Sequence, residues 1–293
     1  MLRILLFLGT NLAIMLMLSA VVTVFGLDRW AYAHSGMNLQ GLLLMCAVFG
    51  MGGAFISLAM SKMLAKMSVG AQVIAEPRGE AEQWLIATVR RHAESAGIGM
   101  PEVALYDAPD MNAFATGMSK NHALVAVSTG LLRSMNREQI SAVLGHEISH
   151  IANGDMVTLT LIQGVLNTFV MFLARVIGGV IDSALQGDRQ QRGGGIGYFL
   201  IVMLLQFVFG LIATVIVMWF SRWREFRADA GGARLGGRGA MISALQVLGA
   251  KPGEADLPKA FQAFGIAGGG TLASLFASHP PIEQRIEALR NAA

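Results

Sequence analysis

The chain has 293 residues, of which 54% are hydrophobic and only 14% are charged. Because soluble globular domains are usually about 25% charged, this composition argues against a soluble protein and indicates a membrane protein. The formal net charge of +3 is too small to favour a nucleic-acid partner, and the single cysteine, Cys46, excludes an intramolecular disulfide framework.

Four stretches approach the length of about 20 apolar residues that a helix needs to cross the hydrocarbon core of a bilayer. They cover residues 4–25, 42–59, 156–181 and 198–220, and only Arg175 interrupts the third. The first stretch is longer than the apolar part of a typical signal peptide and is followed by no small-residue cleavage site, so we expect a membrane anchor.

Lysine and arginine residues near the ends of the apolar stretches predict the orientation of the chain. Two lysines follow the second stretch, and three arginines follow the fourth. Since such residues favour the cytoplasmic side, both flanks should lie there. The sequence thus predicts two transmembrane helices in 1–60, a soluble segment in 61–155, a transmembrane hairpin in 156–220 and a second soluble segment in 221–293.

The first soluble segment mixes helical and extended patterns. Residues 80–96 form an amphipathic helical pattern that ends at Gly97, and residues 103–106 and 123–127 are short, apolar and typical of strands. A further strand between them could form a sheet edge that pairs with an extended peptide, or it could be an ordinary connection. The residues of this candidate edge are Asn112, Ala113, Phe114 and Ala115.

A second helix begins after Asn136, with Gln139 three residues on as in a capping box, and it carries the residues that are typical of a zinc site. His146 and His150 are four residues apart, so both imidazoles lie on one helical face and can bind the same Zn²⁺. Glu147 lies beside them and can act as general base toward a water whose pKa the metal lowers. Two surface histidines are the alternative, but the chain has only six histidines and two have this spacing with a glutamate between them.

A catalytic zinc needs a third protein ligand while one coordination position stays open. In the metzincin pattern a histidine would follow six residues after His150, where this chain has Met156. We expect Glu225 instead, because the hairpin of 156–220 returns the chain to the side that it left. Asp229, one helical turn further, could accept a hydrogen bond from a ligand imidazole. Alternatively, both carboxylates belong to a solvated charge cluster with the neighbouring arginines.

The C-terminal segment offers donors that could stabilise the oxyanion of a tetrahedral intermediate. His279 precedes two prolines that start a helix, and Arg285 lies on that helix. His279 would then have a catalytic role, although it could simply cap the helix. Glycine-rich pieces at 193–195 and 268–270 predict a flexible turn and a mobile loop.

Four motifs together resemble the bacterial HtpX protease family, whose members are heat-shock-associated membrane zinc metalloproteases related to the CAAX prenyl proteases. The motifs are N-A-F-A-T-G at 112–117, H-E-I-S-H-I-A-N-G-D at 146–155, E-F-R-A-D at 225–229 and S-H-P-P at 278–281. The resemblance implies a gluzincin-like domain that faces the cytoplasm in the bacterial inner membrane. We therefore expect an α+β, mainly helical fold, with membrane-spanning helices and a protease domain that contains a small sheet.

The resemblance also implies a set of roles. One zinc per chain would be bound by His146, His150 and Glu225, with Glu147 as general base. Asp229 would support a ligand, the segment at 112–117 would pair with substrate, and His279 with Arg285 would lie near the oxyanion. Members of the family act in quality control of misfolded membrane proteins under stress, and they are prone to self-cleavage. Unfolded or misfolded proteins, chiefly of the membrane, are thus the expected substrates.

Two other classes of protein fit the sequence less well. An intramembrane site-two-type protease also carries H-E-x-x-H, but inside a spanning helix, whereas here Arg137 and Glu138 precede the motif and Asp155 follows it. Such a density of charge does not suit the centre of a bilayer. A transporter or channel with a structural zinc would need ionisable residues within its spans, and the third stretch offers only Arg175.

Overall fold

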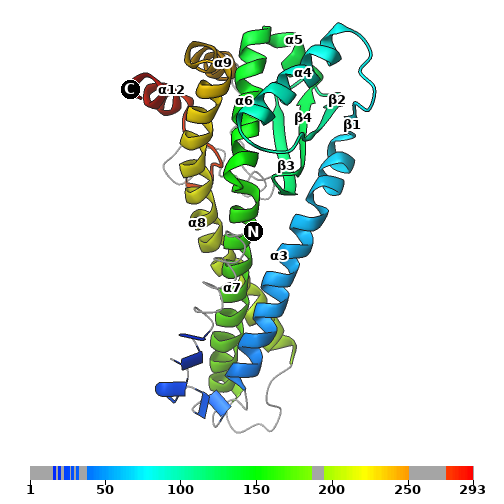
Figure 1. Ribbon diagram of the computed structural model, residues 1–293. Helices are drawn as coiled ribbons and strands as arrows, with labels where there is room; N and C mark the ends of the chain where they lie inside the picture. The colour runs from blue at the N-terminus through cyan, green and yellow to red at the C-terminus, as the bar shows by residue number, and fades with distance from the viewer. Residues whose placement is uncertain are drawn as a thin grey trace. The chain divides into compact units, whose positions relative to one another are not determined.

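A computed structural model describes most of the chain (Figure 1). Its described residues fall into two compact units, one from 1–56 and 160–216 and the other from 57–159 and 217–293. The predicted span at 4–25 lies mostly outside the described residues, as do the loop at 268–270 and most of the turn at 193–195. The described residues are 16–17, 19–20, 23–26, 28–29, 31–32, 38–186, 195–250 and 275–292.

Within these ranges, three helices are long and apolar enough to cross a membrane. They are α3 (Leu39–Val69), α7 (Asp155–Gln186) and α8 (Ile196–Gly236). Each contains one of the predicted stretches, at 42–59, 156–181 and 198–220. Large apolar side chains such as Phe49 and Phe199 are more than half exposed, which suits contact with lipid rather than water.

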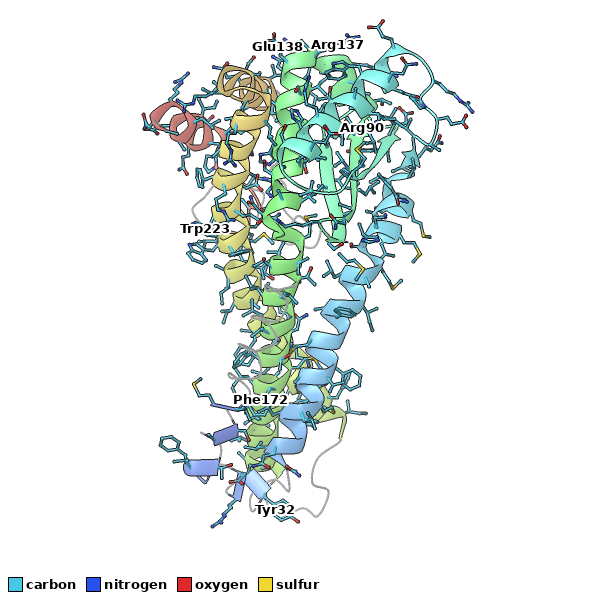
Figure 2. The ribbon with its side chains drawn as sticks, in the orientation of Figure 1. Tyr32, Arg90, Arg137, Glu138, Phe172 and Trp223 are labelled. Carbon is cyan, nitrogen blue, oxygen red and sulfur yellow. The ribbon has the colours of Figure 1, made fainter. Side chains whose placement is uncertain are left out.

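The first unit is held together by small and apolar residues where α3 meets α7. Gly50 lies so close to α7 that a Cβ atom there would be 2.5 Å from Oγ1 of Thr168. Cys46 is fully buried in a cluster with Leu43 and Phe172, as is typical of a structural thiol; Figure 2 marks Phe172. Close approach through glycine is typical of helix packing in membranes.

The second unit contains a sheet with the strand order β1-β2-β4-β3 in the described part of the chain. Strand β4 pairs parallel with β2 and antiparallel with β3, while β1 pairs antiparallel with β2. Strand β3 therefore forms one edge. The predicted strands at 103–106 and 123–127 are confirmed. The strands are β1 (Gln72–Val73), β2 (Glu102–Tyr106), β3 (Ala113–Ser119) and β4 (His122–Ser128).

Helices cover one face of this sheet. Alternating residues of β4, such as Val125 and Val127, pack with Leu85 of α4 and with Leu144 and Ile148 of α6 in one buried core. Figure 1 shows α4 and α6 beside the sheet. Helix α9 packs on α6, and α12 packs on α9. The bounds are α4 (Glu80–Ser95), α5 (Thr129–Ser134), α6 (Arg137–Asn153), α9 (Arg238–Ala250) and α12 (Ile282–Asn291).

Both ends of α6 are fixed by residues that the sequence shows clearly. Asn136 and Gln139 form the expected capping box at its start. Arg137 and Glu138, which lie between them, are marked in Figure 2. At its end Gly154 adopts a left-handed conformation, with φ 66° and ψ 33°. Glycine reaches this conformation at no steric cost, so α7 can begin at the very next residue.

Candidate metal centre

The two histidines of α6 direct their Nε2 atoms toward the same point. His146 and His150 are both buried, their rings meet edge to face with centroids 4.6 Å apart, and their Nε2 atoms are 3.1 Å apart. This geometry follows from the spacing of four residues along a helix. Two imidazole nitrogens so close together present two lone pairs to a single cation.

Glu225 of α8 brings the third group. Its side chain is fully buried, with Oε1 3.2 Å from Nε2 of His150 and Oε2 3.5 Å from Nε2 of His146. One potential ligand atom from each of the three residues lies within 4.8 Å of the others. Glu225 lies on the same continuous helix as the apolar part of α8, which extends to Gly236. The structure thus brings together the three residues that the sequence predicted as metal ligands.

The hydrogen bonding of this cluster fits a bound cation. Oε1 of Glu225 is buried and has no hydrogen-bond partner in the described structure. An unpaired buried carboxylate oxygen costs free energy, which a positive ion would offset. Two imidazoles and a glutamate also form a donor set that is known from catalytic zinc sites, where a fourth position stays open. The residues present therefore fit zinc.

Carboxylates lie behind both imidazoles. Oδ2 of Asp155 accepts a hydrogen bond of 2.8 Å from Nδ1 of His150, and Oδ1 of Asp229 lies 3.0 Å from Nδ1 of His146, although not in hydrogen-bond geometry. Carboxylate partners of this kind hold a ligand imidazole with Nε2 free for the metal. The sequence pointed to Asp229 but not to Asp155. The signal for Asp155 was its place directly after Gly154, which ends the motif helix.

The same carboxylates shift the pKa values of the histidines. Burial alone would lower the pKa of His146, but the carboxylates of Asp229 and Glu225 outweigh it and raise this pKa to about 9. Burial likewise opposes charge on His150, while its interactions with the carboxylates of Asp155 and Glu225 raise its pKa. The carboxylates thus favour a proton on His146 in the metal-free site, and a bound cation would take the place of that proton.

Arg285 of α12 is buried against Asp229. Its Nε and Nη2 atoms donate to Oδ2 and Oδ1 of Asp229 at 2.8 and 2.6 Å, and Nη2 lies 3.4 Å from Oε2 of Glu225. This bidentate pair fixes the orientation of Asp229 behind His146. The structure therefore places Arg285 beside the predicted ligand partner, with its donors directed at carboxylates.

His279 also joins the cluster. Its Nδ1 lies 2.7 Å from Oε2 of Glu225, and its side chain is 48% exposed. Nδ1 of the ring thus contacts the metal cluster, while about half of the side chain is exposed. His279 also lines a cavity of about 710 Å³ together with Trp223, Phe226 and the two prolines that follow it; Figure 2 marks Trp223.

Glu147 and the candidate substrate edge lie in the same unit as the cluster. Glu147 is nearly buried, next to both histidines on α6. Asn112 directly precedes β3, whose first three residues are Ala113, Phe114 and Ala115.

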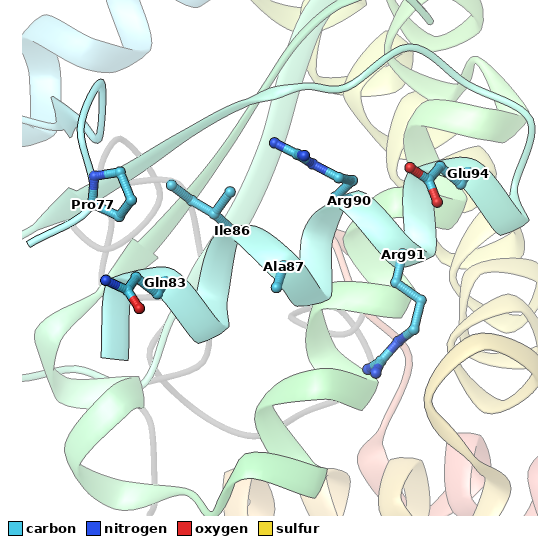
Figure 3. A pocket seen from close by; sticks show the side chains of 7 residues that line it. All are labelled: Pro77, Gln83, Ile86, Ala87, Arg90, Arg91 and Glu94. Carbon is cyan, nitrogen blue, oxygen red and sulfur yellow. The ribbon is translucent and has the colours of Figure 1, made fainter. Parts of the chain in front are cut away.

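A second cavity, of about 350 Å³, lies along the exposed face of α4 and contains none of the predicted site residues (Figure 3). The chemistry is therefore concentrated where α6 and α8 meet.

Comparison with known proteins agrees with this arrangement. Residues 80–293 match the model of the family described as "Peptidase family M48". Protease HtpX of Stenotrophomonas maltophilia is 59% identical over 288 residues, which are 98% of this chain and 97% of that protein. Protease HtpX of Xanthomonas euvesicatoria pv. vesicatoria is 59% identical over 292 residues, 99% of this chain and 97% of that protein.

Among solved structures, the crystal structure of S. mikatae Ste24p resembles this chain with a TM-score of 0.60 at 18% identity. The match covers 94% of this chain and 66% of that one, so this chain spans about two thirds of its length and the likeness shows the fold. The matches to the HtpX proteases cover nearly the whole chain, and the buried His-His-Glu cluster suits zinc. The chain therefore belongs to peptidase family M48, among its membrane zinc metalloproteases of the HtpX type.

Proposed function

We propose that this protease hydrolyses peptide bonds in misfolded or damaged membrane proteins, as part of protein quality control under stress. The observation that carries the proposal is the cluster of His146, His150 and Glu225, whose ligand atoms lie within 4.8 Å of one another. The resemblance of four motifs to the HtpX family supports the substrate class. Long apolar helices support it further, because they would hold the enzyme beside membrane substrates.

The proposed topology places the protease domain on the cytoplasmic side of the bacterial inner membrane. Residues 1–60 and 156–220 would span the bilayer, while 61–155 and 221–293 would form the protease domain. The positive residues that follow α3's and α8's apolar stretches support this orientation. Lys62 and Lys66 both pair with Glu102 of β2.

Glu147 is the proposed general base. Zinc, when bound, polarises the scissile carbonyl and lowers the pKa of a water molecule. The Glu147 carboxylate takes a proton from the attacking water and passes it to the leaving amine, so one group serves in both steps. Its place beside His146 on α6, nearly buried, supports this role.

His279 is the proposed donor to the oxyanion, and Arg285 positions the cluster. Nδ1 of His279 lies 2.7 Å from Oε2 of Glu225 and donates to it, so Nε2 would donate to a substrate oxygen from a ring that carries a proton on both nitrogens. Arg285 is buried and donates two hydrogen bonds to Asp229, so it holds the carboxylate behind His146. Both residues thus act around the metal ligands from the C-terminal segment.

Strand β3 is the proposed site of substrate pairing. Its inner side pairs with β4, which leaves the other side available to an extended peptide. The residues concerned are Asn112, Ala113, Phe114 and Ala115. Recognition through backbone groups would explain a broad specificity, since it reads no particular side chain.

The direct test is cleavage of an unfolded protein. The full-length enzyme in detergent should cleave casein, and a zinc chelator should stop it. Glu147→Gln should retain zinc and lose activity by about 10²- to 10⁴-fold, the usual contribution of a general acid–base group. Unchanged cleavage by Glu147→Gln, or no cleavage by zinc-loaded wild type, would overturn the proposed mechanism.

A further inference from the structure

Asp155 is a buried carboxylate that the mechanism above does not use. It is 2% exposed, and its Oδ2 accepts a hydrogen bond of 2.8 Å from Nδ1 of His150. It is also the first residue of α7, one of the helices that are long enough to cross a membrane. The same carboxylate thus belongs to the membrane helix and contacts a zinc ligand.

This contact depends on an abrupt junction between α6 and α7. Gly154 alone separates the two helices, and its left-handed backbone lets its N–H reach the carbonyl oxygens of His150 and Ile151. From α7, the backbone N–H and Oγ1 of Thr158 both donate to the carbonyl of Gly154 at 3.1 Å. The junction is therefore well bonded, and it returns the side chain of Asp155 to the last turn of α6.

The hydrogen bond selects the form of His150 that can bind a metal. An imidazole that donates from Nδ1 leaves the lone pair of Nε2 free. Nε2 of His150 is the atom that lies 3.1 Å from Nε2 of His146 and 3.2 Å from Oε1 of Glu225. Asp155 thus acts on the ring from the side opposite to the metal cluster.

A purely structural role for Asp155 would have a different physical basis. A carboxylate in the first turn of a helix interacts favourably with the helix dipole and stabilises α7. Such a role would change the stability of the protein, but it would leave the affinity of a folded metal site unchanged. The two roles therefore differ in a measurable quantity.

We propose that Asp155 is a positioning residue that fixes the tautomer and orientation of His150, and that it fastens this zinc ligand to the first turn of α7. The proposal rests on the zinc site described above. It implies that a side-chain hydrogen bond links a metal ligand directly to the start of a membrane helix.

The test is a zinc titration of the full-length protein in detergent, after metal removal, against a chromophoric chelator. Asp155→Ala should raise the zinc dissociation constant about 10- to 100-fold, as for other partners of ligand imidazoles. Asp155→Asn keeps an acceptor oxygen without the charge, so its effect should be smaller. Thr158→Val is the matched control, because it removes a hydrogen bond at the same junction without touching His150; its zinc affinity should equal that of wild type.

Thermal unfolding of the metal-free variants separates folding from binding. If Asp155→Ala and Asp155→Asn both bind zinc as wild type does, whatever their stability, the positioning role is wrong. Equal weakening by Thr158→Val would also overturn it, since the effect would then belong to the junction. If wild type binds no zinc, the metal site itself fails and takes this proposal with it.

Discussion

Oε1 of Glu225 lies 3.2 Å from Nε2 of His150, although a pair of long apolar helical segments separates the two residues in the chain. That oxygen is buried and has no hydrogen bond in the described structure. A folded protein rarely leaves a carboxylate oxygen in this state unless an ion uses it. The relationship explains why α8 continues unbroken from its apolar stretch, since the helix delivers Glu225 to the histidines of α6.

Zinc affinity should depend on pH. Because the pKa of His146 is raised to about 9, the ring carries a proton at neutral pH, and zinc must displace it. The dissociation constant should fall about tenfold per pH unit between roughly pH 7 and 9, and then level off. Calorimetry in buffers of different ionisation enthalpy should show proton release at pH 7.5. Binding that is independent of pH would contradict the electrostatics of the site.

The stability of the metal-free protein should change in the opposite direction. A histidine whose folded pKa lies above its unfolded value of about 6.5 stabilises the fold fully below that value. This contribution disappears as the pH rises through about 9, the pKa of His146. The unfolding temperature of the metal-free protein should thus fall over this range, whereas that of His146→Gln should fall less.

His279→Ala should lower kcat about 10²- to 10³-fold with little change in KM, because the ring would donate to the developing oxyanion, and the protein should keep its zinc, because His146, His150 and Glu225 remain. His122 is a suitable control, since it is exposed on β4 and hydrogen-bonds Ser119 away from the cluster. His122→Ala should keep full activity. Full activity of His279→Ala would reduce His279 to a structural role, and loss of zinc would make it part of the metal site.

Ala115→Pro should weaken cleavage by raising KM. The backbone N–H of Ser128 donates to the carbonyl of Asn112, and hydrogen-bonded positions alternate along an antiparallel pair, so the N–H of Ala115 faces the open edge of β3. Proline removes this donor and is tolerated on edge strands. Ala115→Val keeps the donor and is the control. Equal KM values for the two variants would show that substrate does not pair with this edge.

Packing of α3 against α7 can be tested with two neighbouring glycines. A Cβ at Gly50 would lie 2.5 Å from Oγ1 and 2.7 Å from the backbone nitrogen of Thr168, whereas a Cβ at Gly52 would have nothing within 4 Å. Gly50→Ala should therefore destabilise the protein in detergent by about 1–3 kcal/mol. Gly52→Ala should be neutral or stabilising, because alanine favours a helix. The same unfolding temperature for both variants would contradict this packing.

Much of the site follows from short-range pattern. The spacing of His146 and His150 guarantees a shared face once the helix is recognised, and the apolar stretches explain how Glu225 returns to them. Asp155 was missed, because the direction of its side chain depends on the left-handed turn at Gly154. Arg285 was expected beside the metal site, but its pairing with Asp229 could not be predicted, since contacts between separate elements depend on packing that a sequence does not display.

Among the helices and strands, too, those with a clear local pattern were predicted, and those that depend on packing were not. Helix α6 was predicted to the residue at its start because Asn136 and Gln139 form a capping box. The sequence reasoning did not find β1, which has only two residues, nor α5 and α9. Short elements of this kind are stabilised by their neighbours rather than by their own pattern. Their absence from the prediction did not affect the site, whose ligands lie on long helices.

Zinc content measured beside activity for Glu225→Ala tests the central claim most directly. Wild type and Glu147→Gln should each hold one zinc per chain after dialysis against a weak chelator, because both keep His146, His150 and Glu225. Glu225→Ala should lose its zinc together with casein cleavage, although it folds to the same helical content. A folded Glu225→Ala protein that keeps a full zinc ion would contradict the account, since the third ligand would then lie elsewhere.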